Sequence, residues 1–430
     1  MKTCSWLLLS LAVAAMVPAD PVHAALEAVA IQGDPSPIPF RNYRRMRLPE
    51  ASDAAAARVT FYSPVDGGQK CLFIADPGVA TAPIACERSA SPDGREYTKL
   101  HQSTINASSV PAFAARTLGG FDGVYRGAPA TVVALTNDPV GPQFLDNMTS
   151  AIITDAGDVV FLTELTGGTA GDMAIMRCSG GDGNCSPTTD PAGTGTLTTL
   201  VRLGDAVPDR AGREICAITG IRASNFGIAF VAQTQLDCND SGETPLAGVF
   251  RRAFAGSIVT IALVGEASGV GPTTYTSFRG LPGLSNNGNT AFQTELLGTP
   301  SGGLFVCAPG PCPAALPVKI VEVGQFDDDM NVFRTFSAPG ISDVGDVVFN
   351  TRLGGGPAGT TNGIYVWREA TDTLQALAIK SDPVPGIPGA VFTTFLQGPP
   401  VITSGGKIAF KVRFKRTVAP RNRFGIFIEE

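Results

Sequence analysis

Hydrophobic and polar positions along this chain follow a unit that returns about seven times. Its clearest copies are residues 153–161 (ITDAGDVVF) and 341–349 (ISDVGDVVF), and residues 284–292 and 402–410 follow the same pattern. A looser copy ends at residue 113, and two worn copies end at residues 61 and 230. The phenylalanines that close these units lie 48 to 69 residues apart: Phe61, Phe113, Phe161, Phe230, Phe292, Phe349 and Phe410. A fixed motif at this period is typical of repeat architectures.

Each unit predicts a tight turn followed by a buried strand. An Asn, Ser or Thr at the start can hydrogen-bond the backbone two residues further on, and the glycine supplies the positive φ of the turn. The strand that follows, as in residues 159–165 (VVFLTEL), begins apolar on both faces. An antiparallel sheet with one face in water alternates strictly, so we expect these sheets to stack on one another.

Three further strands belong to most units. A glycine-aliphatic-aromatic step follows at 123–125, 248–250, 303–305, 363–365 and 425–427. An apolar strand ending in a turn comes next, at 200–205, 261–266 and 377–382, and a short segment, such as 332–336 or 391–395, leads into the next unit. Four strands per unit at this period predict an all-β fold made of β-propeller blades.

The two ends of the chain predict how the ring closes. Residues 26–35 (LEAVAIQGDP) match the apolar strand and its turn, whereas the last unit stops after its aromatic step at 425–427. The N-terminus therefore supplies the strand that the C-terminus lacks, and pairing the two removes an exposed edge. We expect a seven-bladed β-propeller closed by its terminal strands; an open β-repeat array or a sandwich is the alternative.

The repeated unit follows the pattern Asn-x-x-Gly-x-x-Ala-Phe, as residues 285–292 (SNNGNTAF) do with serine in place of the asparagine. It resembles the bacterial exported proteins with tandem NxxGxxAF repeats, which often bear varied C-terminal surface anchors. The resemblance covers nearly the whole chain after its first residues. It implies export and a repeat fold but no established activity, so it assigns no functional residue.

The first 24 residues predict a signal peptide. Lys2 precedes an apolar core at residues 6–17, and Val22-His23-Ala24 offers a cleavage site. No later stretch reaches the roughly 18 apolar residues of a membrane helix. We expect residues 25–430 to form one exported domain, secreted or periplasmic, without a transmembrane segment and monomeric.

Cysteine usage agrees with an oxidising compartment. Cys4 lies in the predicted signal, which leaves eight cysteines. Their spacing suggests local disulfides, with other connectivities open: Cys71–Cys86, Cys178–Cys185, Cys216–Cys238 and Cys307–Cys312. A metal site is the rival interpretation, but it needs CxxC-like spacing or neighbouring histidines.

Composition narrows the chemistry. The only histidines are His23 and His101, so a multi-histidine metal centre is excluded, and a serine triad could form only around His101, with Ser103 or Ser108 as nucleophile. The formal net charge of −6 predicts no general attraction to nucleic acid. Trp367 is expected to pack in the core, with a sugar-stacking platform as the alternative.

Acidic residues suggest two kinds of feature. Asp34, Asp138, Asp205, Glu266 and Asp382 recur at strand ends, where good turn formers are needed, so we expect a structural role. Asp237, Asn239 and Ser241 instead place oxygen donors at alternate positions before a glycine, as in the first half of a calcium loop. The acidic residue expected at the end of such a loop is replaced by Gly248, and Asp327–Asp329 is a second acidic loop. Calcium is therefore the one cofactor that the sequence suggests, against a solvated loop tip.

Basic residues gather near both termini: Arg41, Arg44, Arg45, Arg47, Lys411, Arg413, Lys415, Arg416, Arg421 and Arg423. If the termini share a blade, ten positive charges meet there in an acidic protein. One interpretation is an anion-binding face for acidic polysaccharide, lipopolysaccharide phosphate or a partner protein. The other is protection of an edge strand against aggregation.

Two functional classes remain. The first is a binding or scaffold protein that uses a propeller face or the basic closing blade. The second is a hydrolase or lyase with its site in the central channel, which rests on analogy with unrelated propellers. A channel lined by repeat residues would favour binding, and several non-repeated carboxylates or a metal at its mouth would favour an enzyme.

Overall fold

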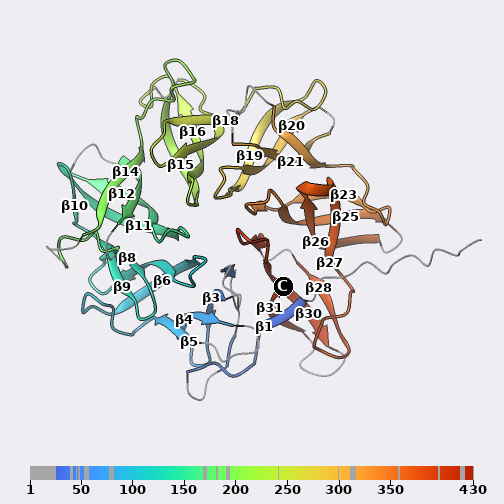
Figure 1. The fold of residues 1–430 in the computed structure, drawn as a ribbon, viewed down its shortest axis with the longest axis horizontal. Coiled ribbons are helices and arrows are strands. Elements are labelled where there is room, and N and C mark those ends of the chain that lie inside the picture. Colours follow the sequence, from blue (N-terminus) through green and yellow to red (C-terminus); the bar gives the residue numbers. More distant parts are fainter. Residues whose placement is uncertain are drawn as a thin grey trace, which may run out of the picture.

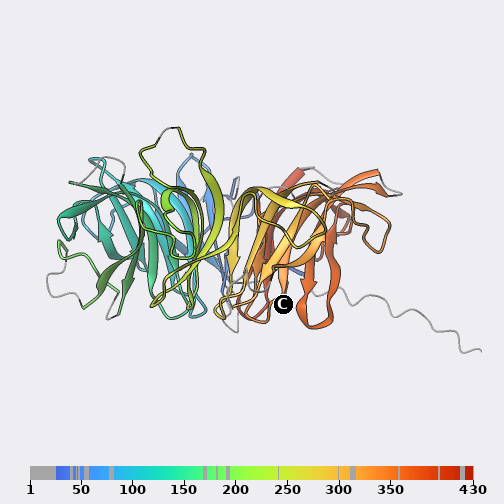
Figure 2. The ribbon, with the colours of Figure 1, turned by 90° about the horizontal axis from the view of Figure 1, so that it is seen from above.

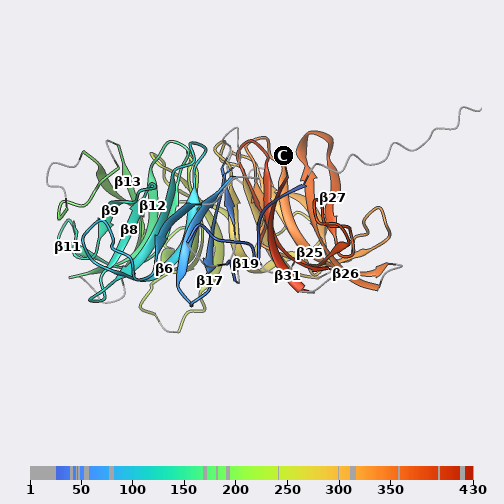
Figure 3. The ribbon, with the colours of Figure 1, turned by 90° about the horizontal axis from the view of Figure 1, so that it is seen from below.

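Seven antiparallel sheets arranged around a central axis make up this protein (Figure 1). The computed structural model describes residues 26–38, 42–44, 46, 49–52, 58–76, 82–167, 172–180, 183–189, 194–240, 242–298, 300–309, 316–356, 359–395, 398–416 and 422–429. The predicted signal peptide, residues 1–24, lies outside this part of the chain. The side views show a flat disc (Figures 2 and 3). The expected seven-bladed β-propeller is therefore confirmed.

Each blade has four main strands, which take equivalent places from the channel outward. The innermost are β2 (Glu50–Ala51), β6 (Tyr97–Ile105), β11 (Gln143–Ile153), β15 (Glu214–Ala223), β19 (Thr274–Leu284), β23 (Val332–Phe336) with β24 (Gly340–Ile341), and β28 (Ala390–Thr394) with β29 (Val401–Ile402). The second strands are β3 (Val59–Pro64), β7 (Pro111–Thr117), β12 (Val159–Thr166), β16 (Gly227–Gln235), β20 (Thr290–Leu297), β25 (Val347–Gly356) and β30 (Ile408–Arg416).

The outer half of each blade holds the other two strands. The third strands are β4 (Lys70–Ala75), β8 (Asp122–Arg126), β13 (Asp172–Ser179), β17 (Leu246–Ala253), β21 (Gly302–Cys307), β26 (Gly359–Arg368) and β31 (Asn422–Glu429). The outermost are β5 (Ala82–Cys86), β9 (Thr131–Leu135), β14 (Thr196–Arg202), β18 (Ile258–Leu263), β22 (Val318–Glu322), β27 (Thr373–Ile379) and β1 (Leu26–Ile31). A two-residue strand, β10 (Pro139–Val140), adds to the third blade, and one 3-10 turn, η1 (Glu369–Thr371), follows β26.

Strand β1 closes the ring by pairing with β31. Leu26 lies opposite Glu429 and Ile31 opposite Gly425, so the first described strand completes the blade that β28, β30 and β31 begin. Figure 1 shows β1 beside β31, next to the C-terminal end of the chain. We number the blades along the chain, from the first (β2–β5) to the seventh, which this pairing closes. The predicted split unit is confirmed.

The phenylalanine anchors form the core of the blades. All seven are at most 1% exposed, because each lies on a second strand that is covered on both faces by neighbouring sheets. In six blades the anchor stacks on an aromatic ring of the third strand, with centroids 5.5 to 6.1 Å apart; Phe292 and Phe305 are one such pair. In the third blade, Met176 lies opposite Phe161 instead. These pairs explain why aromatic residues recur at both positions of the repeat.

Three of the four predicted disulfides join the predicted partners. They are Cys71–Cys86, Cys178–Cys185 and Cys216–Cys238. Cys307 is also disulfide-bonded, and its predicted partner Cys312 lies outside the described residues. Trp367 is 6% exposed and donates its ring N–H to Asp372, so it packs in the core and the sugar-stacking interpretation is wrong.

Candidate functional site

In the second to seventh blades, the repeat motif forms a turn between the first and second strands, at one mouth of the channel. The first polar residue of the turn accepts a hydrogen bond from the backbone N–H four residues further on, as Ser285 does from Asn289 at 3.0 Å and Thr403 from Lys407 at 3.0 Å. The expected partner two residues on occurs at Ser224, which accepts from Phe226. The predicted turn is thus present, but in most copies the side chain accepts from the N–H four residues further on, and not from the N–H two residues further on as we expected.

The next residue of the motif connects neighbouring blades. Asp155 accepts a hydrogen bond from the backbone of Ala107 at 2.7 Å, Asn225 accepts from Ala156 at 2.7 Å, and Asn286 accepts from Asn225 at 2.8 Å.

The same link continues into the sixth and seventh blades. Asp343 accepts from the backbone of Asn286 at 2.6 Å, and the Asp343 N–H donates to the Ser404 carbonyl at 3.0 Å. Side chains also bridge the mouth, since Asn286 Nδ2 and Ser404 Oγ both donate to Asp155 Oδ2, at 2.9 and 3.1 Å. We call Asp155, Asn225, Asn286, Asp343 and Ser404 the mouth ring; the corresponding residue of the first blade, Asp53, lies outside the described residues.

One step deeper, each blade contributes one equivalent residue to the channel wall. This residue lies opposite the position that precedes the phenylalanine anchor. The seven are Glu50, Thr104, Ile152, Arg222, Gly283, Gly340 and Val401, and all of them line the channel cavity. We call them the channel belt. Only two of the seven are charged, and their charges are opposite.

Glu50 and Arg222 meet across the channel. They come from the first and fourth blades, and Arg222 Nη1 lies 3.5 Å from Glu50 Oε1. Gln102 Nε2 donates to the same oxygen at 3.1 Å. The Glu50 side chain is 14% exposed, and this burial raises its pKa, against which Arg222 and Gln102 act. The channel therefore contains a partly desolvated ion pair that the repeat does not require.

Bulges interrupt three of the inner strands that surround the channel. The register of β6 slips between Leu100 and Ser103, so His101 and Gln102 bulge from the sheet. In β11 the slip falls between Asp146 and Ser150, and in β19 it falls between Arg279 and Gly283. Bulges re-aim side chains and are common next to binding sites.

The bulged segments line a cavity of about 390 Å³ in the channel. Its polar lining comprises Glu50, His101, Gln102, Thr104, Thr149, Ser150 and Arg222, and its apolar lining includes Leu281, Ala338, Pro399 and Val401. In the strands β6 and β11, these bulged residues precede the belt while the mouth ring follows it, so the cavity lies on the side of the belt away from the ring. We call it the lower cavity. Its volume lies within the range of roughly 300–1,000 Å³ that is typical of small-molecule sites.

His101 lines this cavity but lacks the arrangement of a triad. No hydrogen bond joins it to Ser103 or Ser108 in the described structure, and the buried Ser103 hydroxyl has no partner. Burial lowers the pKa of His101, and the positive charge of Lys99 acts in the same direction. A neutral imidazole is the consequence at neutral pH.

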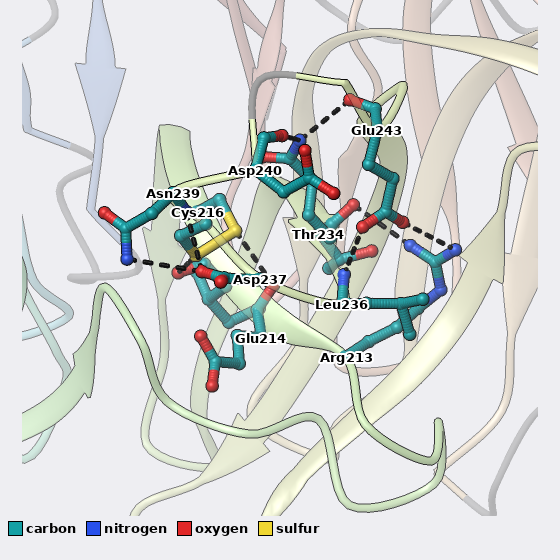
Figure 4. Close-up of a disulfide and its surroundings, with 12 residues drawn as sticks. Arg213, Glu214, Cys216, Thr234, Leu236, Asp237, Asn239, Asp240 and Glu243 are labelled. Atoms are coloured by element: carbon teal, nitrogen blue, oxygen red, sulfur yellow. Dashed lines mark hydrogen bonds and ion pairs between the residues drawn. A yellow bond between two sulfur atoms is a disulfide. The ribbon is translucent and has the colours of Figure 1, made fainter.

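The predicted calcium loop is organised by its own hydrogen bonds (Figure 4). Asp237 Oδ1 accepts from the backbone N–H of Asn239 at 2.8 Å and from its side chain at 3.2 Å, and the Cys216–Cys238 disulfide fixes the loop to β15. Ser241 lies outside the described residues. Within the described chain, no group of three or more His, Cys, Asp or Glu side chains is placed to hold a metal.

The second acidic loop is also tied inward. Asp327 accepts hydrogen bonds from the backbone and side chain of Asn331, at 2.7 and 3.0 Å, and from the Tyr365 hydroxyl at 2.7 Å. Burial and this carboxylate raise the pKa of Tyr365 well above its ordinary value, so the hydroxyl stays a donor.

The strand-end acids take the structural role that we expected. Asp138, Asp205 and Asp382 each accept a hydrogen bond from the backbone N–H three residues earlier, at 2.6 to 2.9 Å, and Glu266 does so at 3.0 Å. Asp34, in the seventh blade, instead lies 3.7 Å from Arg423.

Only some residues of the predicted basic cluster belong to the part of the chain that the structure describes. Arg41, Arg45, Arg47 and Arg421 lie outside the described residues. Arg44 pairs with Asp66 at 2.8 Å, and Lys411 is buried, with its ammonium 4.9 Å from the Phe424 ring centre. Arg416 is half-buried near Asp34. Burial raises the pKa of Asp34, and the positive charges of Arg423 and Arg416 act against this rise.

Arg413 and Lys415 are the exposed members of this cluster. They lie on β30, and neither forms an ion pair with any described residue. The alternation of a strand places them on the same face as Ala409, which packs with Tyr43 and Met46 of the N-terminal segment. The closed ring therefore directs them toward the side where Arg44 lies. We call Arg413 and Lys415 the basic seam.

The edge-protection interpretation is wrong for these residues. Strand β30 lies between β28 and β31, so its backbone groups are paired on both sides and it has no free edge to protect. The outermost strand of this blade is β1.

Sequence reasoning missed Glu50 and Arg222. Glu50 lies in the most worn copy of the repeat, and Arg222 lies in the other worn copy. Aligning the copies on their phenylalanines does not bring the two together, because Glu50 lies 11 residues before Phe61 and Arg222 lies 8 before Phe230, whereas the other five belt residues lie 9 before theirs. Only the strand pairing shows that both occupy the belt.

Among the described residues, no helix is long and apolar enough to cross a bilayer. Residues 318–430, about a quarter of the chain, match the model of a family of unknown function (DUF7453). No curated protein matches the sequence.

Several solved structures are similar in outline. The β-propeller domain of the Trilobed protease from Pyrococcus furiosus has 8% identity and a TM-score of 0.44, over 90% of this chain and 95% of that one. A gluconolactonase from Xanthomonas campestris has 13% identity and a TM-score of 0.34, over 93% and 98%. The polysaccharide lyase Uly1 has 10% identity and a TM-score of 0.37, over 94% and 90%. These proteins differ in activity, and the architecture of this chain rests on its own strand pairing.

Proposed function

We propose that this protein is an exported binding protein that holds an acidic polysaccharide at the basic seam of its closing blade. The observation that carries the proposal is the exposure of Arg413 and Lys415 without an ion pair to any described residue. Most other arginines of the described chain already have a carboxylate partner, as Arg177 has Asp158 and Arg202 has Asp172.

Electrostatics explain how this surface could attract an anion. The whole chain has a formal net charge of −6, so an anionic polymer is repelled by the molecule as a whole and attracted only where positive charge is local. Exposed arginine and lysine side chains are suited to this task, since guanidinium binds carboxylate or sulfate with two hydrogen bonds. Export of the protein is part of the proposal, and its support is the predicted signal peptide, the disulfides and the resemblance to exported tandem-repeat proteins.

The channel mouth favours binding over the hydrolase or lyase alternative. The mouth ring consists of repeat positions, and its carboxylates accept hydrogen bonds from neighbouring blades. Paired acids that act on a glycosidic bond need to face a substrate with free oxygens. This arrangement matches the criterion for a binding protein.

Chromatography on immobilised heparin tests the proposal. We expect the wild-type protein to be retained at low salt and released by added NaCl, because salt screens exposed charges. R413E/K415E should elute at a clearly lower NaCl concentration. The matched control is K99E/K380E, which reverses two exposed lysines on other blades and should elute close to the wild type. Retention that is insensitive to salt, or equal losses in both double variants, would overturn the proposal.

A further inference from the structure

We propose that the lower cavity of the channel is a second binding site, and that it takes a neutral polyhydroxylated ligand of monosaccharide size. The Glu50–Arg222 pair, Gln102 and the bulged inner strands carry this inference. The site is separate from the basic seam and does not depend on it.

The ion pair has no evident structural purpose. Five of the seven belt positions are filled by threonine, isoleucine, valine or glycine, so the propeller closes at this level without charge. A partly exposed pair contributes about 0–1 kcal/mol to stability, and desolvating two charges works against even this gain. A pair that faces a cavity rather than a packed core is more readily explained by what it binds.

The hydrogen-bonding groups around the cavity suit hydroxyl groups. Arg222 contacts Glu50 through one nitrogen, which leaves further N–H donors of the guanidinium available. Glu50 supplies acceptor oxygens, and Gln102 retains its carbonyl oxygen after donating to Glu50. Thr149 and Ser150 add hydroxyls that donate and accept. Donors and acceptors therefore alternate around the cavity, as the hydroxyls of a sugar require.

Charge balance selects a neutral ligand. Glu50 and Arg222 compensate each other, and His101 is held neutral by burial and by Lys99. A ligand with a net charge would enter a partly desolvated site with no counter-charge to spare, which costs free energy. The apolar wall of Leu281, Ala338 and Pro399 can cover the C–H groups of a sugar ring.

The ion pair also closes one end of the lower cavity. Because Glu50 and Arg222 belong to the first and fourth blades, their contact crosses the channel and separates the lower cavity from the mouth ring. Figure 1 shows these blades on opposite sides of the axis, with β2–β5 and β15–β18 facing each other. A ligand in the lower cavity would thus contact the pair from one side only.

Ligand-observed NMR with the full-length mature protein tests this inference. The probes are D-glucose, D-galactose and D-mannose, with D-glucuronate as the charged comparison, and calorimetry gives the dissociation constant of any hexose that binds. We expect at least one neutral hexose to bind more tightly than glucuronate. E50Q should weaken this binding about tenfold, the loss expected for one charge-assisted hydrogen bond. Q102A, which alters an exposed side chain and should fold normally, should weaken it about threefold.

A matched control is E295Q, which removes the carboxylate of the Arg279–Glu295 ion pair outside the lower cavity and should leave hexose binding unchanged. The inference is overturned if none of the three hexoses binds, or if glucuronate binds more tightly. It is also overturned if E50Q and Q102A both bind like the wild type. R413E/K415E should bind the hexose normally, so failure of the seam proposal and failure of this one are distinguishable.

Discussion

The mouth ring and the channel belt lie one step apart along the same channel, yet they use polar residues in opposite ways. In the mouth ring, Asp155, Asn286 and Asp343 repeat one motif position, and each accepts a hydrogen bond from the backbone of the preceding blade. In the belt, Glu50 and Arg222 break the pattern that the other blades follow, and they contact each other. Polar residues that recur with the fold hold the blades together, whereas those that occur once are the candidates for function.

The largest effect that we expect comes from breaking the mouth ring. Asn286→Ala removes the acceptor of the Asn225 N–H and the donor to Asp155 and Asp343. Leaving such partly buried groups unpaired costs about 2 kcal/mol, and in a domain of this size that lowers Tm by about 2–3 °C. Differential scanning calorimetry measures this change, and the heparin elution of the variant should match that of the wild type. An unchanged Tm would show that the hydrogen bonds of the mouth ring do not stabilise the propeller.

A smaller effect is expected from breaking the belt pair. Removing one partner, in E50A or R222A, leaves the other charge unpaired in the cavity and should cost about 1 kcal/mol. The double variant E50A/R222A leaves no unpaired charge, so it should be more stable than the less stable single variant. Urea unfolding of the four proteins completes the cycle. Strictly additive losses would contradict the interpretation that these two residues act as a pair.

The smallest effect is the pH dependence of this pair. Burial raises the pKa of Glu50 above its ordinary value of 4.5, so the folded protein binds that proton more readily than the unfolded chain does. The resulting stabilisation is fully present below pH 4.5 and is lost as the pH rises through the folded pKa. The Tm of the wild type minus that of E50Q should therefore decrease between pH 4 and pH 7. An increase over this range would mean that Arg222 lowers the pKa of Glu50 more than burial raises it.

Much of the fold could be predicted from the sequence because its determinants are local. The phenylalanine anchors, the aromatic step and the turn glycines recur at a fixed order, and each has one physical role. Gly157 and Gly345 both take φ of +91°, as the motif requires. Closure was also predictable, because residues 26–31 visibly complete the last unit.

The function of the motif's second polar residue could not be predicted in the same way. Asn286 looks like a turn residue within its own loop, but its partners are Asn225, Asp343 and Asp155, which are 57 to 131 residues away. A single copy of the motif carries no sign of these contacts, which exist only when neighbouring blades pack. The edge-protection interpretation failed for a similar reason, since only the sheet order shows that β30 has a neighbour on both sides.

The pairing of β1 with β31 has a consequence for the order of events during synthesis. Leu26 is made 403 residues before its partner Glu429, so β1 emerges from the ribosome with no strand to join. Contacts between such distant segments form late, because the chain must first give up the entropy of a very large loop. A nascent chain that stops before β31 would therefore be an open ring with two free strand edges. Quality control in the compartment where this protein folds needs to recognise only those edges to tell an incomplete molecule from a finished one.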